Sequence, residues 1–417
     1  MKLRIMKLIA CIGSFTALCL HTSSAEAIFA SVKSTGMAAT SISYPVDSLA
    51  GAYNPAGIAS VGDRFDLEAG WVHDTGEAHV HDNLSPLVNG NYEGMKNKNV
   101  FPAGFGISKT WNIDCDWDIA AGLVLYNRNY QKTTYKKNLV LFGTSKPGLE
   151  YVNETLSPII AIKWCDSHTL GVSANFQIER IKVNGLENFD NIFRSVAPGH
   201  VTNRGYGYAN GWGVTIGYYG QITNELSIGV TYQPETTMSR IEKYKGFLAE
   251  RGRLNIPRKI GAGIAYRILP CLVFAFDVEQ IRWKPIRALS NMFPSAVRLG
   301  AKNGAGFGFR DQWYYRFGIE WQIDECWTAR IGFRHANTPV KKSQTAVNLL
   351  TLDTVENFIT AGATWAVNGC NEISIVGAYG FENEVKGKNS IPLAFGGGEV
   401  NIKEQKYAIG LAWGWKF

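Results

Sequence analysis

The chain has 417 residues, 18% of them charged, and a formal net charge of +7 at pH 7 from basic residues scattered along its length. A mild, dispersed excess of this kind excludes the dense basic surface of a nucleic-acid-binding protein. Aromatic residues make up 12% of the chain and glycines number 44, and no stretch beyond the N-terminus approaches the ~18 to 20 apolar residues that a membrane-spanning helix needs.

The N-terminus has the pattern of a secretory signal peptide. Basic residues up to Lys7 precede an apolar core, Leu8–Leu20, which is too short to span a bilayer, and an A-x-A cleavage sequence ends at Ala27. We therefore expect residues 1–27 to be removed during export. An exported chain that enters a membrane without spanning helices has to pair its backbone groups in a closed barrel.

Residues 28–62 lack the alternation of a strand. They are rich in Ala, Ser and Gly, and Asn54 followed by Pro55 and Ala56 has the signature of a helix start. Asn caps free N–H groups there, and Pro is tolerated at the first helical position. We expect a compact segment of short turns; the alternative is a loose tail.

Over residues 63–417, alternating strands recur in pairs joined by short polar turns. Six such hairpins, a front strand at Phe65–Trp71 and a closing strand at Tyr407–Phe417 give fourteen. Short turns on one rim and long connections on the other predict an all-β fold, a transmembrane antiparallel β-barrel of about 14 strands. The turns are centred at 114–116, 165–167, 223–225, 270–271, 324–326 and 369–371, and the long connections are about 74–100, 131–150, 182–205, 239–253, 285–309, 338–352 and 381–403.

The closing strand shows the pattern most clearly. From Tyr407 to Phe417, odd-numbered residues are large and apolar while even-numbered ones are small or polar, so one face suits lipid. Lys109 shares the outward parity of its strand and would cost ~2 to 4 kcal/mol near the midplane, so we expect a register-shifting bulge or a position near an interface. Aromatic residues beside the short turns predict an interfacial girdle: Trp111, Trp117, Trp164, Tyr266, Trp321, Trp327, Trp365 and Trp415.

From about Ala38 to Phe417 the chain resembles the FadL/OmpP1/TodX family of outer-membrane transporters of fatty acids and other hydrophobic molecules. The resemblance rests on Asn54-Pro55-Ala56, Gly211-Trp212-Gly213, Gly217-Tyr218, Thr231-Tyr232, Leu254-Asn255-Ile256-Pro257, the Asp277 to Trp283 segment, Gly308-Phe309-Arg310-Asp311, Arg330-Ile331-Gly332-Phe333 and Thr338-Pro339-Val340.

This resemblance implies that residues 28–62 fold into the barrel lumen as a helical hatch that contains Asn54, Pro55 and Ala56. It implies ligand capture at extracellular loops, an apolar interior pocket, and lateral release near the third strand. There Gly122 is small enough to permit a kink. Lipid and lipopolysaccharide of the outer membrane would surround the barrel, and the barrel-assembly machinery would read the terminal Phe417.

The family's fatty-acid pocket uses basic side chains for the carboxylate. Residues 304–307 carry no charge where the family has a lysine, and Lys302 is the nearest substitute. The other candidate carboxylate partners, by charge alone, are Arg310, Arg316, Arg330 and Arg334. Their alternative role is that of solvated residues lining the lumen.

The sequence contains no G-x-S-x-G, P-loop, H-E-x-x-H or C-x-x-C motif, so we predict no enzymatic activity, cofactor or metal. His73, His79 and His81 cluster in the first long loop, where metal binding is the alternative to a polar loop that happens to be His-rich.

Five cysteines remain after the signal peptide, and all fall in the short turns: Cys115, Cys165, Cys271, Cys326 and Cys370. Strands are ~4.8 Å apart, so neighbouring turns are ~10 Å apart, whereas a disulfide needs Cα atoms within ~7 Å. Intermolecular disulfides to another copy or to a cysteine-rich periplasmic partner are one hypothesis; free thiols are the other.

The favoured function is passive uptake of hydrophobic compounds such as long-chain fatty acids across the outer membrane. The alternatives are a general porin for small hydrophilic solutes and a disulfide-anchored structural protein of the envelope.

Overall fold

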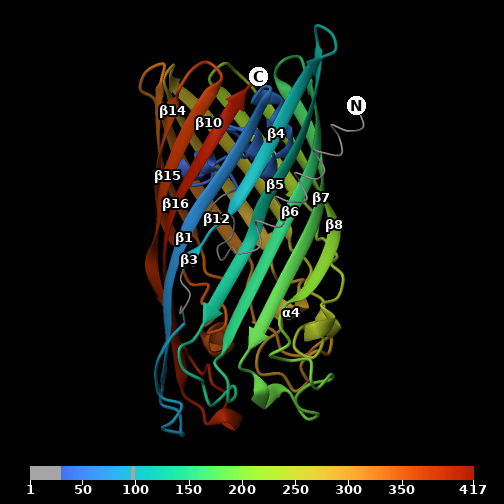
Figure 1. Cartoon of the computed structure of the whole chain (residues 1–417), viewed down its shortest axis with the longest axis vertical. Coiled ribbons are helices and arrows are strands. Elements are labelled where there is room, and N and C mark those ends of the chain that lie inside the picture. The colour runs from blue at the N-terminus through green and yellow to red at the C-terminus, as the bar shows by residue number, and fades with distance from the viewer. Residues whose placement is uncertain (1–29, 95–98) are drawn as a thin grey trace, which may run out of the picture.

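The computed structural model describes residues 30–94 and 99–417, so the predicted signal peptide lies outside the described residues. The described strands form one antiparallel sheet that closes where β1 (Arg64–His81) pairs with β16 (Glu399–Lys416) (Figure 1). Over these residues, fourteen strands, β1 and β4 to β16, follow one another around the wall, and the short β2 (Gly90–Glu93) and β3 (Asn99–Val100) pair with β1. The predicted fourteen-stranded barrel is confirmed.

The wall strands between β1 and β16 run in chain order. They are β4 (Ala103–Asn112), β5 (Trp117–Thr134), β6 (Gly148–Trp164), β7 (His168–Asn184), β8 (Gly207–Gln221), β9 (Leu226–Gln233), β10 (Arg258–Leu269), β11 (Leu272–Arg282), β12 (Gln312–Gln322), β13 (Trp327–Ala336), β14 (Asn357–Ala366) and β15 (Asn371–Val385).

The described helices are short, and they lie in the N-terminal segment and the long connections rather than in the wall. The N-terminal segment contains α2 (Val32–Gly36), η1 (Ser48–Ala52) and η2 (Pro55–Ser60), and the long connections contain η3 (Glu187–Phe189), η4 (Glu242–Tyr244), α3 (Ala249–Gly252), α4 (Arg287–Ser290), η5 (Lys342–Gln344), α5 (Thr345–Asn348) and η6 (Leu393–Phe395). Among the described residues, no helix is both long and apolar enough to cross a membrane.

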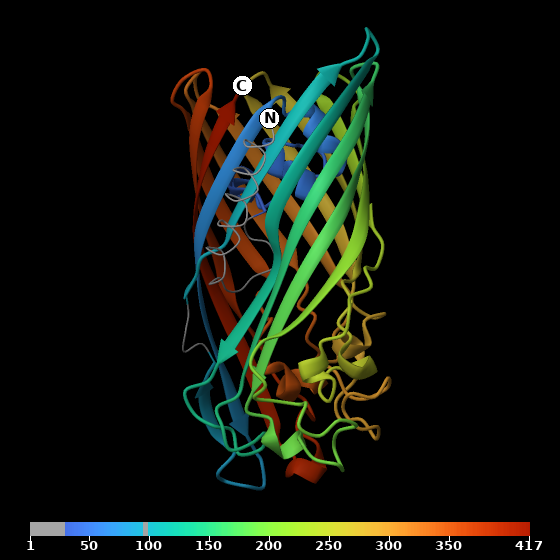
Figure 2. The ribbon, with the colours of Figure 1, turned by 45° about the vertical axis from the view of Figure 1, so that its right-hand side comes forward.

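All six short turns lie where the sequence predicts them, at the end of the barrel that also holds the C-terminus, which we call the turn end; the long connections cover the opposite loop end (Figure 2). The connection predicted to start at Asp74 is shorter than expected, because β1 continues to His81 and pairs there with both β16 and β2. Cross-strand pairing thus extends the wall into the polar loop layer.

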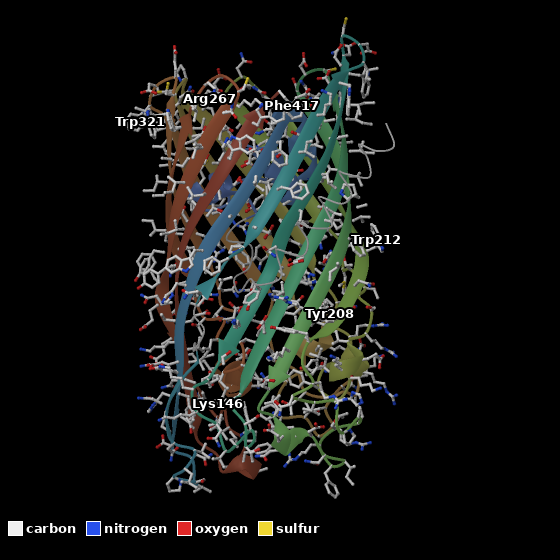
Figure 3. The ribbon with its side chains drawn as sticks, in the orientation of Figure 1. Lys146, Tyr208, Trp212, Arg267, Trp321 and Phe417 are labelled. Carbon is white, nitrogen blue, oxygen red and sulfur yellow. The ribbon has the colours of Figure 1, made fainter. Side chains whose placement is uncertain are left out.

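The outer face of the wall is apolar. On β16, Ile409, Leu411 and Trp413 are exposed outward, while Ala408 is buried on the lumen side. Figure 3 shows Trp321 and Phe417 near the turn end, with Trp212 roughly halfway along the barrel and Tyr208 nearer the loops. These aromatics bracket a lipid-facing band.

Lys109 lies near the turn end rather than in the middle of this band. Its Nζ is 2.7 Å from Asp63 Oδ2, just before β1 begins, and the β4–β5 register is continuous through it. The structure therefore places it at an interface, where the charge is solvated and paired, and it shows no register shift at this position.

Candidate functional site

Residues 30–62 form a compact plug inside the barrel, which we call the hatch (Figure 2). Asn54 organises its last turn: Oδ1 accepts the N–H of Ala56 at 3.1 Å, and Nδ2 donates to the carbonyls of Ile42 and Tyr218 at 2.8 and 2.9 Å. Pro55 takes the first position of η2. One side chain thus caps a helix, ties two hatch segments together and joins them to β8.

Carboxylates of the wall hold the hatch by its backbone. Asp277 Oδ2 accepts the N–H groups of Ser41 and Ile42 at 2.8 and 3.0 Å, and Glu68 Oε2 accepts the N–H of Val32 at 2.7 Å. Buried N–H groups require partners. Short turns buried inside a barrel cannot satisfy all of them internally, so the wall supplies acceptors.

Ion pairs and a tyrosine hydroxyl add to the attachment. Lys33 of α2 is ion-paired with Glu372 of β15, which Arg64 also contacts, and Tyr44 Oη donates to Glu320 Oε1 at 2.7 Å. Anchors on β1, β11, β12 and β15 surround the hatch. The hatch is therefore held from several sides of the lumen.

Close packing of the hatch also depends on glycine in the wall. A Cβ on Gly229 of β9 would overlap the carbonyl oxygen of Ile42, and one on Gly171 of β7 would overlap the backbone at Pro55 and Ala56. Only glycine lets hatch backbone approach these strands so closely.

Between the hatch and the loop end, the lumen contains an inner cavity of about 740 Å³ including its mouth. Its apolar lining comes from β6, β7 and the β9–β10 and β11–β12 connections, and includes Leu149, Ile181, Leu254, Trp283, Phe307 and Phe309. Polar groups also line it, and Arg128, Asn129, Gln131 and Asn153 among them belong to β5 and β6. An apolar cavity with a few convergent polar groups is the usual form of a site for an organic ligand.

Asp353 brings a carboxyl group to this cavity from the connection between β13 and β14. Burial raises its pKa above the ordinary value, although the charges of Lys406 and Arg334 oppose the shift.

The inner cavity adjoins cavities on both sides. Toward the loops, Leu248 and Phe307 also line an outer cavity of about 470 Å³ whose other walls are almost entirely apolar. Toward the turn end, Arg128 and Asn129 also line a third space of about 610 Å³ that touches Tyr53 of the hatch. Because neighbouring cavities share these lining residues, the three cavities lie in series from the loops to the hatch.

Arg128 stands at an irregularity in the third wall strand. The register of β5 against β6 shifts between Asn127 and Asn129, which leaves Arg128 as the extra residue of a bulge. Its Nη1 donates to Gln233 Oε1 on β9 at 2.6 Å. Arg128 is not among the site residues expected from the sequence, although an arginine of inward parity in this strand was a usable signal.

In the described residues, the ladder between β4 and β5 stops beside this bulge. It ends at the pair Phe105↔Leu125, and the next described backbone hydrogen bond on that side joins the N–H of Thr134 to the carbonyl of Gly94 at 2.8 Å. In the described residues the intervening edge of β5 has no strand partner, and Figure 1 shows β4 ending partway along the barrel. Gly122 lies in an unbroken ladder with Ser108 and Ile159, so the irregularity is nearer the loops than the kink expected at Gly122.

The five basic residues named from the sequence are dispersed. Lys302 and Arg310 are exposed in connections, with Arg310 Nε donating to the Thr338 carbonyl at 2.9 Å. Arg330 is paired with Glu320 at 2.7 Å. Arg316 and Arg334 border the space above the hatch. Arg316 is paired with Glu279 at 3.2 Å, and the Arg334 guanidinium lies 4.1 Å from the centre of the Phe358 ring. None of the five lines the inner cavity.

The remaining sequence candidates lie at the surface. His79 and His81 stack with ring centroids 5.4 Å apart, and His73 Nδ1 is 2.9 Å from Asn99 Oδ1. Within residues 30–94 and 99–417, no group of three or more His, Cys, Asp and Glu side chains is arranged to hold a metal. Phe417 is half exposed and packs on Trp415, with ring centroids 5.0 Å apart. The five turn cysteines are exposed and unbonded.

Solved structures of similar fold are transporters of the same architecture. They include the Pseudomonas putida toluene transporter TodX (15% identity, 92% of this chain and 97% of that one, TM-score 0.63), a Pseudomonas aeruginosa FadL homologue (15%, 96% and 99%, 0.67) and the Ralstonia pickettii toluene transporter TbuX (16%, 92% and 97%, 0.61). No curated protein sequence matches the chain.

The family described as outer membrane protein transport protein (OMPP1/FadL/TodX) matches residues 19–417. The match covers the hatch and all fourteen wall strands. The chain therefore belongs to the OMPP1/FadL/TodX family of outer-membrane transport proteins, and it is a transporter rather than an enzyme.

Proposed function

We propose that the protein admits hydrophobic compounds through the outer membrane, with long-chain fatty acids as the ligand class. The observation that carries this proposal is the inner cavity, which combines a large apolar lining with the Arg128 guanidinium and amide side chains of β5 and β6. An alkyl chain fits the apolar lining, and a carboxylate fits the guanidinium and amides.

The route runs from the loops inward. A solute partitions into the outer cavity, passes Leu248 and Phe307 into the inner cavity, and leaves sideways past the unpaired edge of β5 into the bilayer. At every stage the solute exchanges contact with water for contact with apolar surface. Its transfer therefore follows the concentration gradient without an energy source. The hatch closes the direct route toward the turn end, which favours a ligand-specific passage over an open aqueous pore.

Two of the similar structures are those of toluene transporters, so neutral aromatic hydrocarbons are the competing ligand class. Purified protein in detergent is loaded with a fluorescent long-chain fatty acid analogue, which is then displaced with either an unlabelled long-chain fatty acid or its methyl ester. We expect the acid to displace the probe at least tenfold more effectively than the ester.

Equal displacement by acid and ester would show that the ligand class is neutral hydrophobic compounds rather than fatty acids. Failure of the probe to bind, in protein that retains the barrel's heat-dependent gel mobility, would contradict a hydrophobic ligand site altogether.

A further inference from the structure

We propose that Cys271, Cys326 and Cys370 join the periplasmic rim of the barrel, by disulfide bonds, to a thiol-bearing protein of the periplasm. In this family the short turns face the periplasm. The three residues occupy the turns before β11, β13 and β15, and all three are exposed and unbonded.

The register keeps these three thiols apart. The Cys271 carbonyl accepts the N–H of Gln322, the Cys326 carbonyl that of Ala366, and the Cys370 carbonyl that of Lys416, at 2.8, 2.8 and 2.7 Å. The three cysteines therefore sit beside the ends of β12, β14 and β16. Each lies two strands from the next, ~10 Å along the rim, which exceeds the ~7 Å between Cα atoms that a disulfide allows.

The other two cysteines are arranged differently. The N–H of Cys165 donates to the carbonyl of Asp116 at 2.9 Å, which brings Cys165 within one residue of Cys115 across adjacent strands. The ~10 Å separation expected of all neighbouring turns does not hold for this pair. The two cysteines of this pair therefore serve as an internal comparison.

Exposed thiols at this rim meet an oxidising compartment. A rim thiolate attacks a disulfide of a periplasmic thiol oxidase, forms a mixed disulfide and releases one oxidase thiol. A thiolate of the partner then attacks the rim sulfur and releases the second oxidase thiol. The oxidase disulfide takes up both electrons and both thiol protons, and one bond joins rim and partner.

The shape of the barrel favours a periplasmic partner over a second barrel. Two cylinders embedded side by side in one membrane touch along a single line, so they can bring together the thiols of one turn at most. Three turns spread along an arc of the rim are all accessible to a protein lying beneath it. We therefore assign the partner as a soluble or wall-bound protein with at least two exposed cysteines.

The test uses the full-length protein in intact cells. N-ethylmaleimide first blocks free thiols, and non-reducing gels then separate envelope proteins for immunoblotting. We expect a species heavier than the monomer that reverts to monomer on reduction, and mass spectrometry should find a peptide of a periplasmic protein disulfide-linked to Cys271, Cys326 or Cys370.

The triple variant C271S/C326S/C370S should lose this species, while the matched double variant C115S/C165S should keep it. Equal amounts in the outer membrane and equal heat-dependent mobility establish that both variants fold. Monomer alone in the wild-type lane overturns the proposal, as does a cross-linked species composed of two copies of this chain.

Discussion

Arg128 and Gln233 are joined through the lumen by a hydrogen bond of 2.6 Å from Arg128 Nη1 to Gln233 Oε1. The first residue is the bulged position of β5, and the second is the buried last residue of β9. This contact aims a guanidinium at the place where the inner cavity meets the space above the hatch.

Replacement of Arg128 by Gln should weaken the binding of a fatty acid and leave that of its methyl ester unchanged. A hydrogen bond to a charged group contributes about 1.5–3 kcal/mol, which corresponds to roughly tenfold to a hundredfold in affinity. Probe displacement by acid and ester measures the effect. Arg204→Gln, at an exposed loop position, is the control, and equal loss for acid and ester in Arg128→Gln would remove the proposed role in carboxylate binding.

Loss of the Asp277 carboxylate should loosen the hatch. Asp277→Ala leaves the N–H groups of Ser41 and Ile42 without their acceptor, at a cost of about 1–3 kcal/mol for each buried group left unsatisfied. We expect more frequent or larger openings in planar-bilayer recordings. Asp277→Asn retains an acceptor oxygen and should have a smaller effect; identical, wild-type recordings from both variants would show that this anchor does not hold the hatch.

A single methyl group should displace the hatch at β9. In Gly229→Ala the new Cβ overlaps the carbonyl oxygen of Ile42, whereas the matched Gly377→Ala on the outer face of β15 meets no atom within 4 Å. Limited trypsin digestion reports the change, because Lys33 is only 5% exposed in the closed hatch. Faster cleavage at Lys33 is expected for Gly229→Ala alone, and equal rates in the two variants would contradict the packing.

Deletion of Phe417 should reduce assembly into the outer membrane without blocking export. The residue packs on Trp415, and its N–H donates to the Asp63 carbonyl at 3.2 Å, next to the seam between β1 and β16. The measurement is the amount of heat-modifiable barrel in the outer membrane, with Phe417→Tyr as the aromatic control. Wild-type amounts of the deletion variant would rule out Phe417 as an assembly signal.

The barrel was predictable because its signals are local. Alternation such as that of Tyr407–Phe417 follows from a wall with lipid on one side and a lumen on the other, and polar residues mark each short turn. The end of β1 was not predictable in this way. The extension of β1 to His81 depends on two cross-strand pairings, His81 with Glu399 and Val80 with Gly90. The first partner is distant in the sequence, and the second follows an intervening loop.

The candidate site was less accessible to sequence reasoning. The inner cavity is assembled from Leu254 of the β9–β10 connection and from Trp283 and Phe309 at opposite ends of the β11–β12 connection, and no local pattern specifies that they meet. The bulge that exposes Arg128 to the cavity is a property of the pairing of β5 with β6. Charge alone instead drew attention to Arg330 and Arg316, whose carboxylate partners are supplied by the wall.

The most direct test of the account is uptake through the inner cavity. Cells that lack other transporters for hydrophobic compounds express the wild type, Leu254→Trp or Leu393→Trp, and the accumulation of a radiolabelled long-chain fatty acid is measured over time. Leu254 lines the cavity and is 5% exposed, whereas Leu393 is 89% exposed at a loop tip, so the same substitution fills the route in one variant only. Uptake near that of cells without the protein is expected for Leu254→Trp, and wild-type uptake for Leu393→Trp; wild-type uptake by both variants, at equal amounts in the outer membrane, would show that solutes do not pass through the inner cavity.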